Sequence, residues 1–328
     1  MNLPEPRGQL SGQLVRALRD GAPVTGSTTS GKEDLQLSLW VLYELHYRGF
    51  DEVDDRREWD PALIGLRAGL EEQFEADLRD ACAPVVALAG DSDWVPTQLE
   101  DITAYDNGTS LPRFLQREAT SDQYLEFLVQ RSIYHLKESD PHAFVVPRLA
   151  GAAKVALAEL QYDEFGGGRP EALHSQLYAD ALEESGLDPT YGAYIDRVPA
   201  YALAVNNAMS LFGLHRRLRG AAMGHLAAFE MTSSLPCRRY LQGAERLDLP
   251  QAVRHYFDEH VEADAVHEHI AARDICGSLV EADPPLREDV LFGAAACVHL
   301  DAVAGEKMID AWMRDSSTLL PELGREVA

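Results

Sequence analysis

Residues 260–267 read HVEADAVH and place His260, Asp264 and His267 at positions i, i+4 and i+7. On an α-helix these three positions lie above one another on a single face. The same face continues through Tyr256, so polar side chains occupy a stripe that should pack into a core. The spacing therefore predicts a helix that turns three metal-capable side chains toward the interior. A solvated polar face is the alternative, because further acidic residues flank the motif.

Helical periodicity also dominates the rest of the chain after residue 33. Apolar residues recur at intervals of three and four, Pro61 opens a helical segment, and the pair Asp140-Pro141 closes another. Alternating runs rich in Val, Ile and Thr, which are typical of strands, are almost absent. The sequence therefore predicts an all-α bundle. Apart from the segment that Pro61 opens, we expect helices over 35–46, 124–136, 149–164, 170–184, 198–214, 218–234, 251–275 and 285–314.

Composition divides the chain into three parts. Residues 1–33 are rich in Gly, Pro, Ser and Thr and have little periodic hydrophobicity, so they predict an irregular N-terminal arm. Residues 34–120 are expected to form a helical accessory segment, and residues 121–328 a catalytic bundle.

Charge and cysteine content exclude several classes of protein. The 328 residues include 29 Lys and Arg and 54 Asp and Glu, which gives a formal net charge of −25. Such a surplus of acid repels nucleic-acid phosphates and anionic membrane surfaces. No transmembrane or signal segment is evident, so we expect a cytoplasmic protein. The four cysteines are far apart, which argues against zinc ribbons and redox dithiols, and we expect them to be buried apolar residues.

Glu230 is the second candidate for a metal ligand. It ends an apolar stripe that includes Leu226 and Phe229. A buried carboxylate without a partner is costly, so a cation there would relieve the cost. The alternative is an ion pair between Glu230 and Arg238 or Arg239.

A third signal surrounds the triple glycine of residues 166–168. An acid-bearing helix ends at these glycines and a new segment begins at Pro170, so the break can bring Glu164 and His174 toward one pocket. Glu171 and His174 also show the i, i+3 spacing of ferritin-like di-iron bundles. For Glu171 we favour the alternative of an acid that complements a helix dipole.

These candidate ligands favour a particular kind of metal centre. Carboxylates with a few imidazoles suit iron or manganese, and the lack of cysteine ligands argues against structural zinc. Several carboxylates also balance the charge of two divalent ions. The pattern therefore indicates a dinuclear centre.

Four segments resemble the haem-oxygenase-like di-iron oxidases, also called iron-containing redox enzymes: LWVLYELHYRGF (39–50), HLKESDPHAFVVPRL (135–149), ELQYDEFGGGRPEALHSQLY (159–178) and HVEADAVH (260–267). The resemblance implies a helical bundle of haem-oxygenase type that binds non-haem iron in place of haem. It also implies seven iron ligands, which fall on Glu138, Glu164, His174, Glu230, His260, Asp264 and His267. Glu44 and His46, although metal-capable, are then expected to be packing residues.

The resemblance further implies an O2-dependent oxidoreductase with two Fe ions, cycling between Fe2+ and Fe3+, and O2 as co-substrate. We expect a small amino-acid-like substrate in specialised metabolite biosynthesis, with C–H oxidation, desaturation or cyclisation, or N-oxygenation as the outcome. No catalytic residue is expected beyond the metal ligands. Partners would be the substrate, an external electron donor and a second copy in a homodimer. Candidates to bind a substrate carboxylate are Arg148, Arg169 and Arg239.

Three alternatives stay open from the sequence. A fatty-acid oxidative decarboxylase of the same family would share the iron site. A metal-free haem-oxygenase-like hydrolase or binding protein would need a nucleophile in its pocket, and none of the four cysteines is placed by its sequence context to serve. A ferritin-like storage protein would hold iron without oxidising a substrate.

Overall fold

The computed structural model describes residues 1–24, 26, 29–106 and 108–321, and for residues 262–265 it describes the backbone only. The prediction of an all-α protein is confirmed, because no strand occurs in these ranges. The α-helices are α1 (Gln9–Asp20), α2 (Lys32–Glu44), α3 (Pro61–Val86), α4 (Val95–Thr103), α5 (Leu111–Arg117), α6 (Ser121–His135), α7 (Asp140–Ala143), α8 (Gly151–Glu164), α9 (His174–Glu184), α10 (Ala200–Leu214), α11 (Arg219–Met231), α12 (Ser234–Arg246), α13 (Gln251–His269), α14 (Ser278–Ala282) and α15 (Arg287–Trp312).

Shorter helical turns connect these helices. The chain from α13 continues without a break into a π-helix, η6 (Ile270–Gly277), and then into α14. The 3-10 turns are η1 (Asp55–Trp59), η2 (Val146–Arg148), η3 (Gly166–Gly168), η4 (Pro170–Ala172), η5 (Arg216–Leu218) and η7 (Pro284–Leu286).

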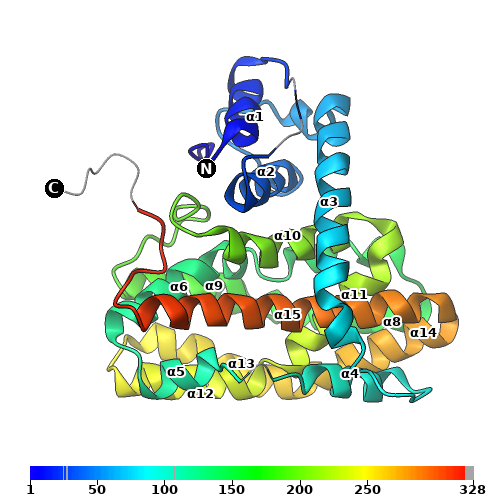
Figure 1. The fold of residues 1–328 in the computed structure, drawn as a ribbon. Coiled ribbons are helices and arrows are strands. Elements are labelled where there is room, and N and C mark those ends of the chain that lie inside the picture. Colours follow the sequence, from blue (N-terminus) through cyan, green and yellow to red (C-terminus); the bar gives the residue numbers. More distant parts are fainter. Residues whose placement is uncertain (25, 27–28, 107, 322–328) are drawn as a thin grey trace.

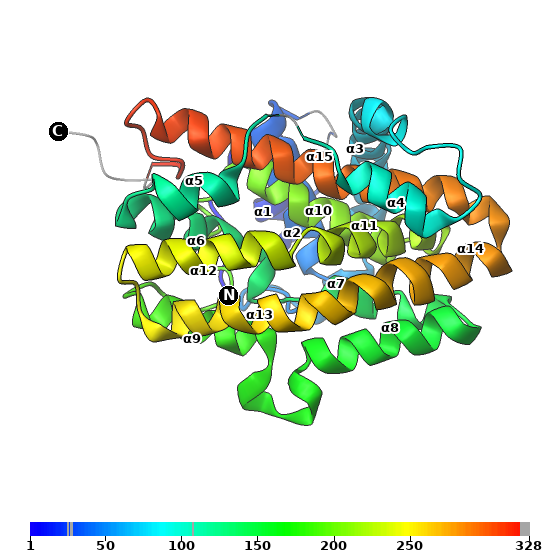
Figure 2. The same cartoon turned by 90° about the horizontal axis from the view of Figure 1, so that it is seen from below.

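The long helix α15 crosses the width of the molecule and organises the bundle around it (Figure 1). Helices α10 and α11 pack against α15, and α11 also packs on α13. Seen from below, α12 and α13 run side by side, with α8 next to the far end of the same yellow and orange layer (Figure 2). Helices α1 and α2 lie on the opposite side, beyond α10 (Figure 1).

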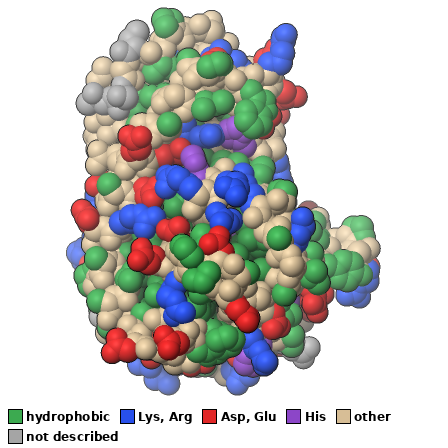
Figure 3. All heavy atoms as spheres, turned by 90° about the vertical axis from the view of Figure 1, so that its right-hand side faces the viewer, with side chains coloured by type: hydrophobic (Ala, Val, Ile, Leu, Met, Phe, Trp, Pro, Cys, Tyr) green, Lys and Arg blue, Asp and Glu red, His purple; other side chains and the backbone are tan. Residues whose placement is uncertain are grey.

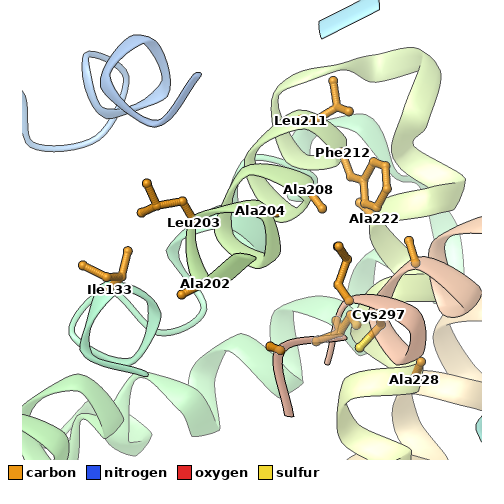
Figure 4. Packing of buried hydrophobic residues seen from close by; sticks show 14 of the residues in the cluster. Ile133, Ala202, Leu203, Ala204, Ala208, Leu211, Phe212, Ala222, Ala228 and Cys297 are labelled. Carbon is orange, nitrogen blue, oxygen red and sulfur yellow. The ribbon is translucent and has the colours of Figure 1, made fainter. Parts of the chain in front are cut away.

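Small residues allow α11 and α15 to cross closely. A Cβ added at Gly224 would overlap the carbonyl oxygen of Val290, and one added at Gly293 would overlap that of Ala221. The two glycines therefore let each backbone approach the other. Around this crossing lies one large apolar core, in which α10 supplies Leu203, Leu211 and Phe212 (Figure 4). The crossing places the end of α11, which carries Glu230, beside the layer that holds α13.

The prediction of an irregular arm over residues 1–33 is wrong for residues 9–20, which form α1. Leu10 and Leu14 are fully buried on this helix. Its start is capped from outside, because the Asp34 carboxylate accepts hydrogen bonds from the backbone N–H of Leu10 at 3.1 Å and of Ser11 at 2.8 Å. The capping group thus belongs to α2, so the local composition of the segment could not reveal the helix.

Several predicted helix boundaries shift in the structure. The helix expected over 170–184 is divided at Leu173 into η4 and α9, which begins at His174. The helix expected over 218–234 ends at Met231, and α12 follows as a separate helix that the periodicity did not predict. The division of residues 34–120 and 121–328 into an accessory segment and a catalytic bundle stays a prediction.

Charged side chains cover the face of the molecule near α3 with both signs interspersed (Figure 3). Arg79 pairs with Glu75 and with Asp289 of α15, and Arg217 also pairs with Glu75. Surface pairs of this kind contribute about 1 kcal/mol or less each. Among the described residues, no helix combines the length and the apolar character that crossing a bilayer requires.

Candidate metal centre

Helix α13 supplies two histidines to the interior of the bundle. His260 and His267 are 6% and 2% exposed, respectively, so both sit inside rather than on a solvated face. The Nδ1 atom of His260 lies 2.7 Å from the carbonyl oxygen of Tyr256, one turn earlier. A proton donated from Nδ1 to this carbonyl leaves Nε2 as the free lone pair. The side chain of Asp264, the third residue of the motif, lies outside the described residues.

One group of candidate ligands consists of Glu138, His174 and His260. One ligand atom from each lies within 4.8 Å of the others, and all three side chains are buried. Nε2 of His260 lies 3.7 Å from Oε2 of Glu138. Glu138 lies in the turn after α6, separated from the helix end by Leu136 and Lys137, and Ser139 next to it adopts a left-handed conformation with φ 67°. This turn of the backbone directs the chain into α7 immediately after the carboxylate.

A second group consists of Glu164, Glu230 and His267, again with ligand atoms within 4.8 Å of one another and all buried. Nδ1 of His267 lies 3.4 Å from Oε1 of Glu164 and 3.6 Å from Oε2 of Glu230. Glu164 is the last residue of α8, immediately before the glycine turn. Glu230 thus meets His267, and not Arg238, which is exposed on α12.

The two groups adjoin each other. Oε2 of Glu164 lies 3.2 Å from Nδ1 of His174, so a carboxylate of the second group touches an imidazole of the first. The rings of His174 and His260 have centroids 4.5 Å apart. The six buried side chains therefore form one continuous polar interior with two foci, one near His260 and one near His267.

The atoms at these foci fit metal ions. Two ligands that each lie about 2.1 Å from one ion are about 3.0–3.5 Å apart, which is close to the separations found here. Nε2 of His260 is buried and has no hydrogen-bond partner among the described residues. A buried nitrogen left without a partner costs about 1–3 kcal/mol. Coordination of a cation would remove that cost, and oxygen and imidazole donors without thiolates suit iron or manganese.

The electrostatics of the second group also favour a cation. Burial raises the pKa of Glu230 to about 7, and the neighbouring Glu164 carboxylate adds to this rise, although His267 opposes it. Burial lowers the pKa of His267, but Glu164 and Glu230 outweigh it and raise the value to about 11. The group therefore retains protons when no other positive charge is present, which is the behaviour of a cluster of carboxylates that lacks its counterion.

A hydrogen-bond network supports the first group from behind. The Tyr256 hydroxyl donates to Oε2 of Glu138 at 3.0 Å and lies 2.8 Å from Nδ1 of His135. Nδ1 of His135 is also 2.8 Å from Oε1 of Glu138. Burial raises the pKa of Glu138, but His135 and His260 reverse the effect, so the net direction is down. The network holds this carboxylate ionised and fixed in orientation.

A cavity of about 80 Å³ adjoins the first group, and we call it the inner cavity. Glu138 and His260 contribute to its wall. Aromatic rings from α6, α11, α12 and α13 form much of the remainder, and two charged residues, Arg131 and Asp301, also line it. The aromatic and histidine residues in the wall are Phe127, His135, His225, Phe229, Tyr240, Tyr256 and Phe257.

The three arginines predicted to bind substrate lie outside the inner cavity. Arg148 donates to the carbonyl oxygens of Gly213 and Leu214 and so caps α10. Arg169 is exposed and lines a separate pocket that His174 and His267 also line. Arg239 lines a groove on the surface. None of the three lines the inner cavity, so a substrate held there would not contact them.

Other predicted residues have structural partners. Glu171 is exposed and does not join the His174 group. Glu44 is fully buried and pairs with Lys137 at 3.4 Å. His46 lies 3.1 Å from Glu58, on the same side of the molecule. Both therefore act as packing residues, in line with the expectation for them.

Three of the four cysteines, Cys82, Cys276 and Cys297, are buried as expected, and Cys237 is partly exposed. Cys237 and Cys297 both line the inner cavity, where no cysteine was expected. Burial raises the pKa of the Cys297 thiol, however, so it stays protonated near neutral pH. Because a thiolate is the nucleophilic form, Cys297 is not activated for catalysis in the way a cysteine hydrolase requires.

Two residues that sequence reasoning missed, Arg131 and His135, share a recognisable spacing with the predicted ligand Glu138. Arg131, His135 and Glu138 stand at i, i+4 and i+7, the same pattern as the motif on α13, and all three line the inner cavity. This pattern could have identified the face of α6 that points toward the site. No local signal distinguished His225, which lies in an otherwise apolar stretch of α11 between Arg219 and Glu230.

An all-helical protein with two buried groups of carboxylates and imidazoles belongs to the class of bundles that can hold metal ions between their helices. The family model described as iron-containing redox enzyme matches residues 125–302, more than half of the chain. The chain belongs to this family, as its sequence predicted, and it has the family's all-α, haem-oxygenase-like fold. All seven predicted ligands fall within the matched range.

The chain is also similar to a curated protein, the nitrosourea synthase of Streptomyces achromogenes subsp. streptozoticus. The two are 28% identical over 156 residues, which is 48% of this chain and 33% of the synthase. The chain thus spans about a third of the length of this relative.

Proposed function

We propose that the protein is an O2-dependent non-haem di-iron oxidase that acts on a small amino-acid-like substrate in specialised metabolite biosynthesis. The observation that carries this proposal is the pair of adjoining buried groups, Glu138, His174 and His260 beside Glu164, Glu230 and His267. Membership of an iron-containing redox family supports iron as the metal. Similarity to a nitrosourea synthase supports a biosynthetic role.

Seven residues would hold the two iron ions: the six of these groups together with Asp264, whose backbone lies on the same helix as both α13 histidines. When bound, the ions supply the electrons and the Lewis acidity for reduction of O2. Protein side chains set the environment. The Tyr256 hydroxyl and His135 orient Glu138, and the aromatic walls keep water away from the reacting region.

The size of the inner cavity favours a small substrate. At about 80 Å³ it is much smaller than the roughly 300–1,000 Å³ typical of pockets for drug-sized ligands. A compact amino-acid side chain suits this space better than the long chain of a fatty acid. C–H oxidation with desaturation or ring closure, and N-oxygenation, remain the reaction types that we propose.

The proposal has two consequences for partners. Reduction of O2 to two waters consumes four electrons, of which a desaturation supplies two, so an external electron donor must provide the other two. We also propose a cytoplasmic homodimer without affinity for nucleic acids or membranes, in keeping with the net charge of −25.

Oxygen consumption by the iron-loaded protein tests the proposal. The purified chain is loaded anaerobically with Fe(II), and O2 uptake is then measured with the standard L-amino acids, simple amines and fatty acids in turn. We expect iron-dependent uptake that rises with an amino-acid or amine substrate, together with an oxidised product in mass spectrometry. Uptake triggered by fatty acids alone would favour the decarboxylase, and iron binding without any substrate-dependent uptake would favour a storage protein.

A further inference from the structure

The inner cavity has a charged site away from the two groups of candidate metal ligands, which we call the metal groups. Nη2 of Arg131 donates a hydrogen bond to Oδ1 of Asp301, and both side chains line the cavity. Arg131 is the more enclosed of the two, since its side chain is 18% exposed and that of Asp301 is 49% exposed. Arg131 precedes Glu138 by seven positions on and just after α6, which corresponds to about 10 Å along a helix.

This ion pair lies between the inner cavity and the surface. A groove on the surface, which Arg113 and Arg239 also line, shares Thr232, Pro236 and Asp301 with the inner cavity. Asp301 thus faces both spaces. A molecule that passes from the groove to the metal groups would meet the ion pair on its way.

The wall of the inner cavity also includes phenylalanine rings and a buried histidine. Phe127, Phe229 and Phe257 contribute rings to its wall. His225 also lines it, is 1% exposed, and has no hydrogen-bond partner for either ring nitrogen among the described residues. Burial lowers the pKa of His225 to about 3, so the ring is neutral near pH 7. A buried polar ring without a partner in a cavity wall is a vacant position for a polar atom of a ligand.

We propose that the inner cavity binds the zwitterion of a free α-amino acid, with its α-carboxylate on Arg131, its α-ammonium on Asp301, and its side chain extending toward Glu138 and His260. The proposal rests on the function proposed above for its substrate class and adds the binding mode. It makes the substrate side chain, and not the α-amino group, the part presented to the metal groups.

Charge balance is the reason for a zwitterion. A guanidinium alone would select any anion, including a fatty acid, but repulsion from Asp301 offsets much of the attraction between Arg131 and a simple carboxylate. A ligand with one charge of each sign matches both members. Its α-ammonium would also lie at the boundary with the surface groove, which Asp301 lines.

Binding to the metal-free protein tests this mode separately from iron chemistry. Each standard L-amino acid is titrated into the chain by calorimetry, and the best ligand is compared with its amide, which lacks the carboxylate, and with its deaminated acid. We expect one or a few amino acids to bind, and both analogues to bind about 10- to 100-fold more weakly, because each loses one charged contact. If no amino acid binds, or if the deaminated acid binds as well as its parent, the proposal is wrong.

Substitutions test which side chains contact the amino-acid ligand. Arg131→Gln and Arg131→Lys should each weaken the best ligand, the second because an ammonium cannot form the two-pronged contact of a guanidinium. Arg238→Gln is the matched control, since Arg238 is exposed on the same bundle and lines neither space. His225→Phe should weaken ligands without changing the preference for a zwitterion. The analogue comparison on the wild-type chain decides the outcome even if an Arg131 variant does not fold.

Measurements of iron uptake and O2 consumption distinguish failure of the binding mode from failure of the proposed oxidase function. If the chain takes up iron and consumes O2 with an amine or fatty acid, while no amino acid binds, the binding mode fails and the oxidase survives. If an amino acid binds through Arg131 but no iron is taken up, the binding mode survives and the proposed oxidase fails.

Discussion

Glu164 and His267 meet inside the bundle, with Oε1 of the glutamate 3.4 Å from Nδ1 of the histidine. One residue ends α8 and the other lies near the end of α13, so the relative placement of these two helices sets the distance between them. The π-helix that follows α13 packs directly on α8. The geometry of the second group of candidate ligands therefore depends on how η6 packs against α8.

Removal of a histidine from α13 should remove one iron selectively. The chain should bind about two iron ions, and His260→Ala and His267→Ala should each leave about one, because the two histidines belong to different groups. Asp264→Ala should lose at least one. Iron content after anaerobic loading and desalting measures this. The control is His269→Ala, whose side chain is 82% exposed on the same helix, and full iron content in the His267 variant would contradict the assignment.

Glu44→Gln should destabilise the chain and weaken the Glu138 group. Glu44 accepts a hydrogen bond from the Tyr191 hydroxyl at 2.6 Å and pairs with Lys137, which is 2% exposed and adjacent to Glu138. Removal of the negative charge leaves a buried ammonium without its partner, at a cost of about 3–5 kcal/mol. Denaturant unfolding measures the cost, and iron content measures the effect on the site.

The matched double variant Glu44→Gln with Lys137→Met should recover most of the free energy of unfolding, since it removes both buried charges. A single variant as stable as the wild type would show that the pair does not hold this region together.

Asp34 should make the docking of α1 dependent on pH. Burial raises the pKa of Asp34, but hydrogen bonds from Ser11, Ser30 and Leu10 outweigh it, so the net direction is down. A carboxyl with a lowered pKa stabilises the fold above its unfolded value near 4 and loses this contribution as the pH falls further. Asp34→Asn should therefore cost about 1–3 kcal/mol at pH 7. The difference from wild type should shrink below about pH 4, and a difference that does not change with pH would contradict this.

Gly224→Ala should strongly destabilise the bundle. The added methyl would overlap the Val290 carbonyl oxygen, so α11 and α15 would have to separate, which typically costs about 1–3 kcal/mol and occasionally more. Gly65→Ala on α3 is the control, since nothing lies within 4 Å of its Cβ position and the same change should stabilise that helix by about 0.5–1 kcal/mol. Equal effects of the two substitutions in denaturant unfolding would show that the crossing is not tight.

Part of the candidate site could be predicted from local spacing. His260 and His267 share a helix, and helical geometry alone places side chains seven residues apart on one face. Glu230 was identified because a carboxylate interrupted an apolar stripe, and it is indeed buried. The assignment of these residues as iron ligands stays a prediction.

Other parts could not be predicted from spacing. Which carboxylate meets which histidine depends on contacts between helices, as the 3.2 Å separation of Glu164 and His174 across the glycine turn shows. The predicted arginines failed to reach the inner cavity for the same reason, since their directions follow from packing and not from proximity in sequence.

The sequence by itself determined the helical class, the family and the face of α13 that carries its histidines, because periodicity and motif spacing are properties of consecutive residues. Only the tertiary structure decided that α1 is a helix, that Arg131 and Asp301 meet, and that His225 lines a cavity. In each of these cases the deciding group comes from another helix: Asp34 caps α1, α15 brings Asp301 to α6, and the Gly224–Gly293 crossing seats α11 against α15. Contacts of this kind form only when the chain folds, because burial brings together groups that the sequence keeps far apart.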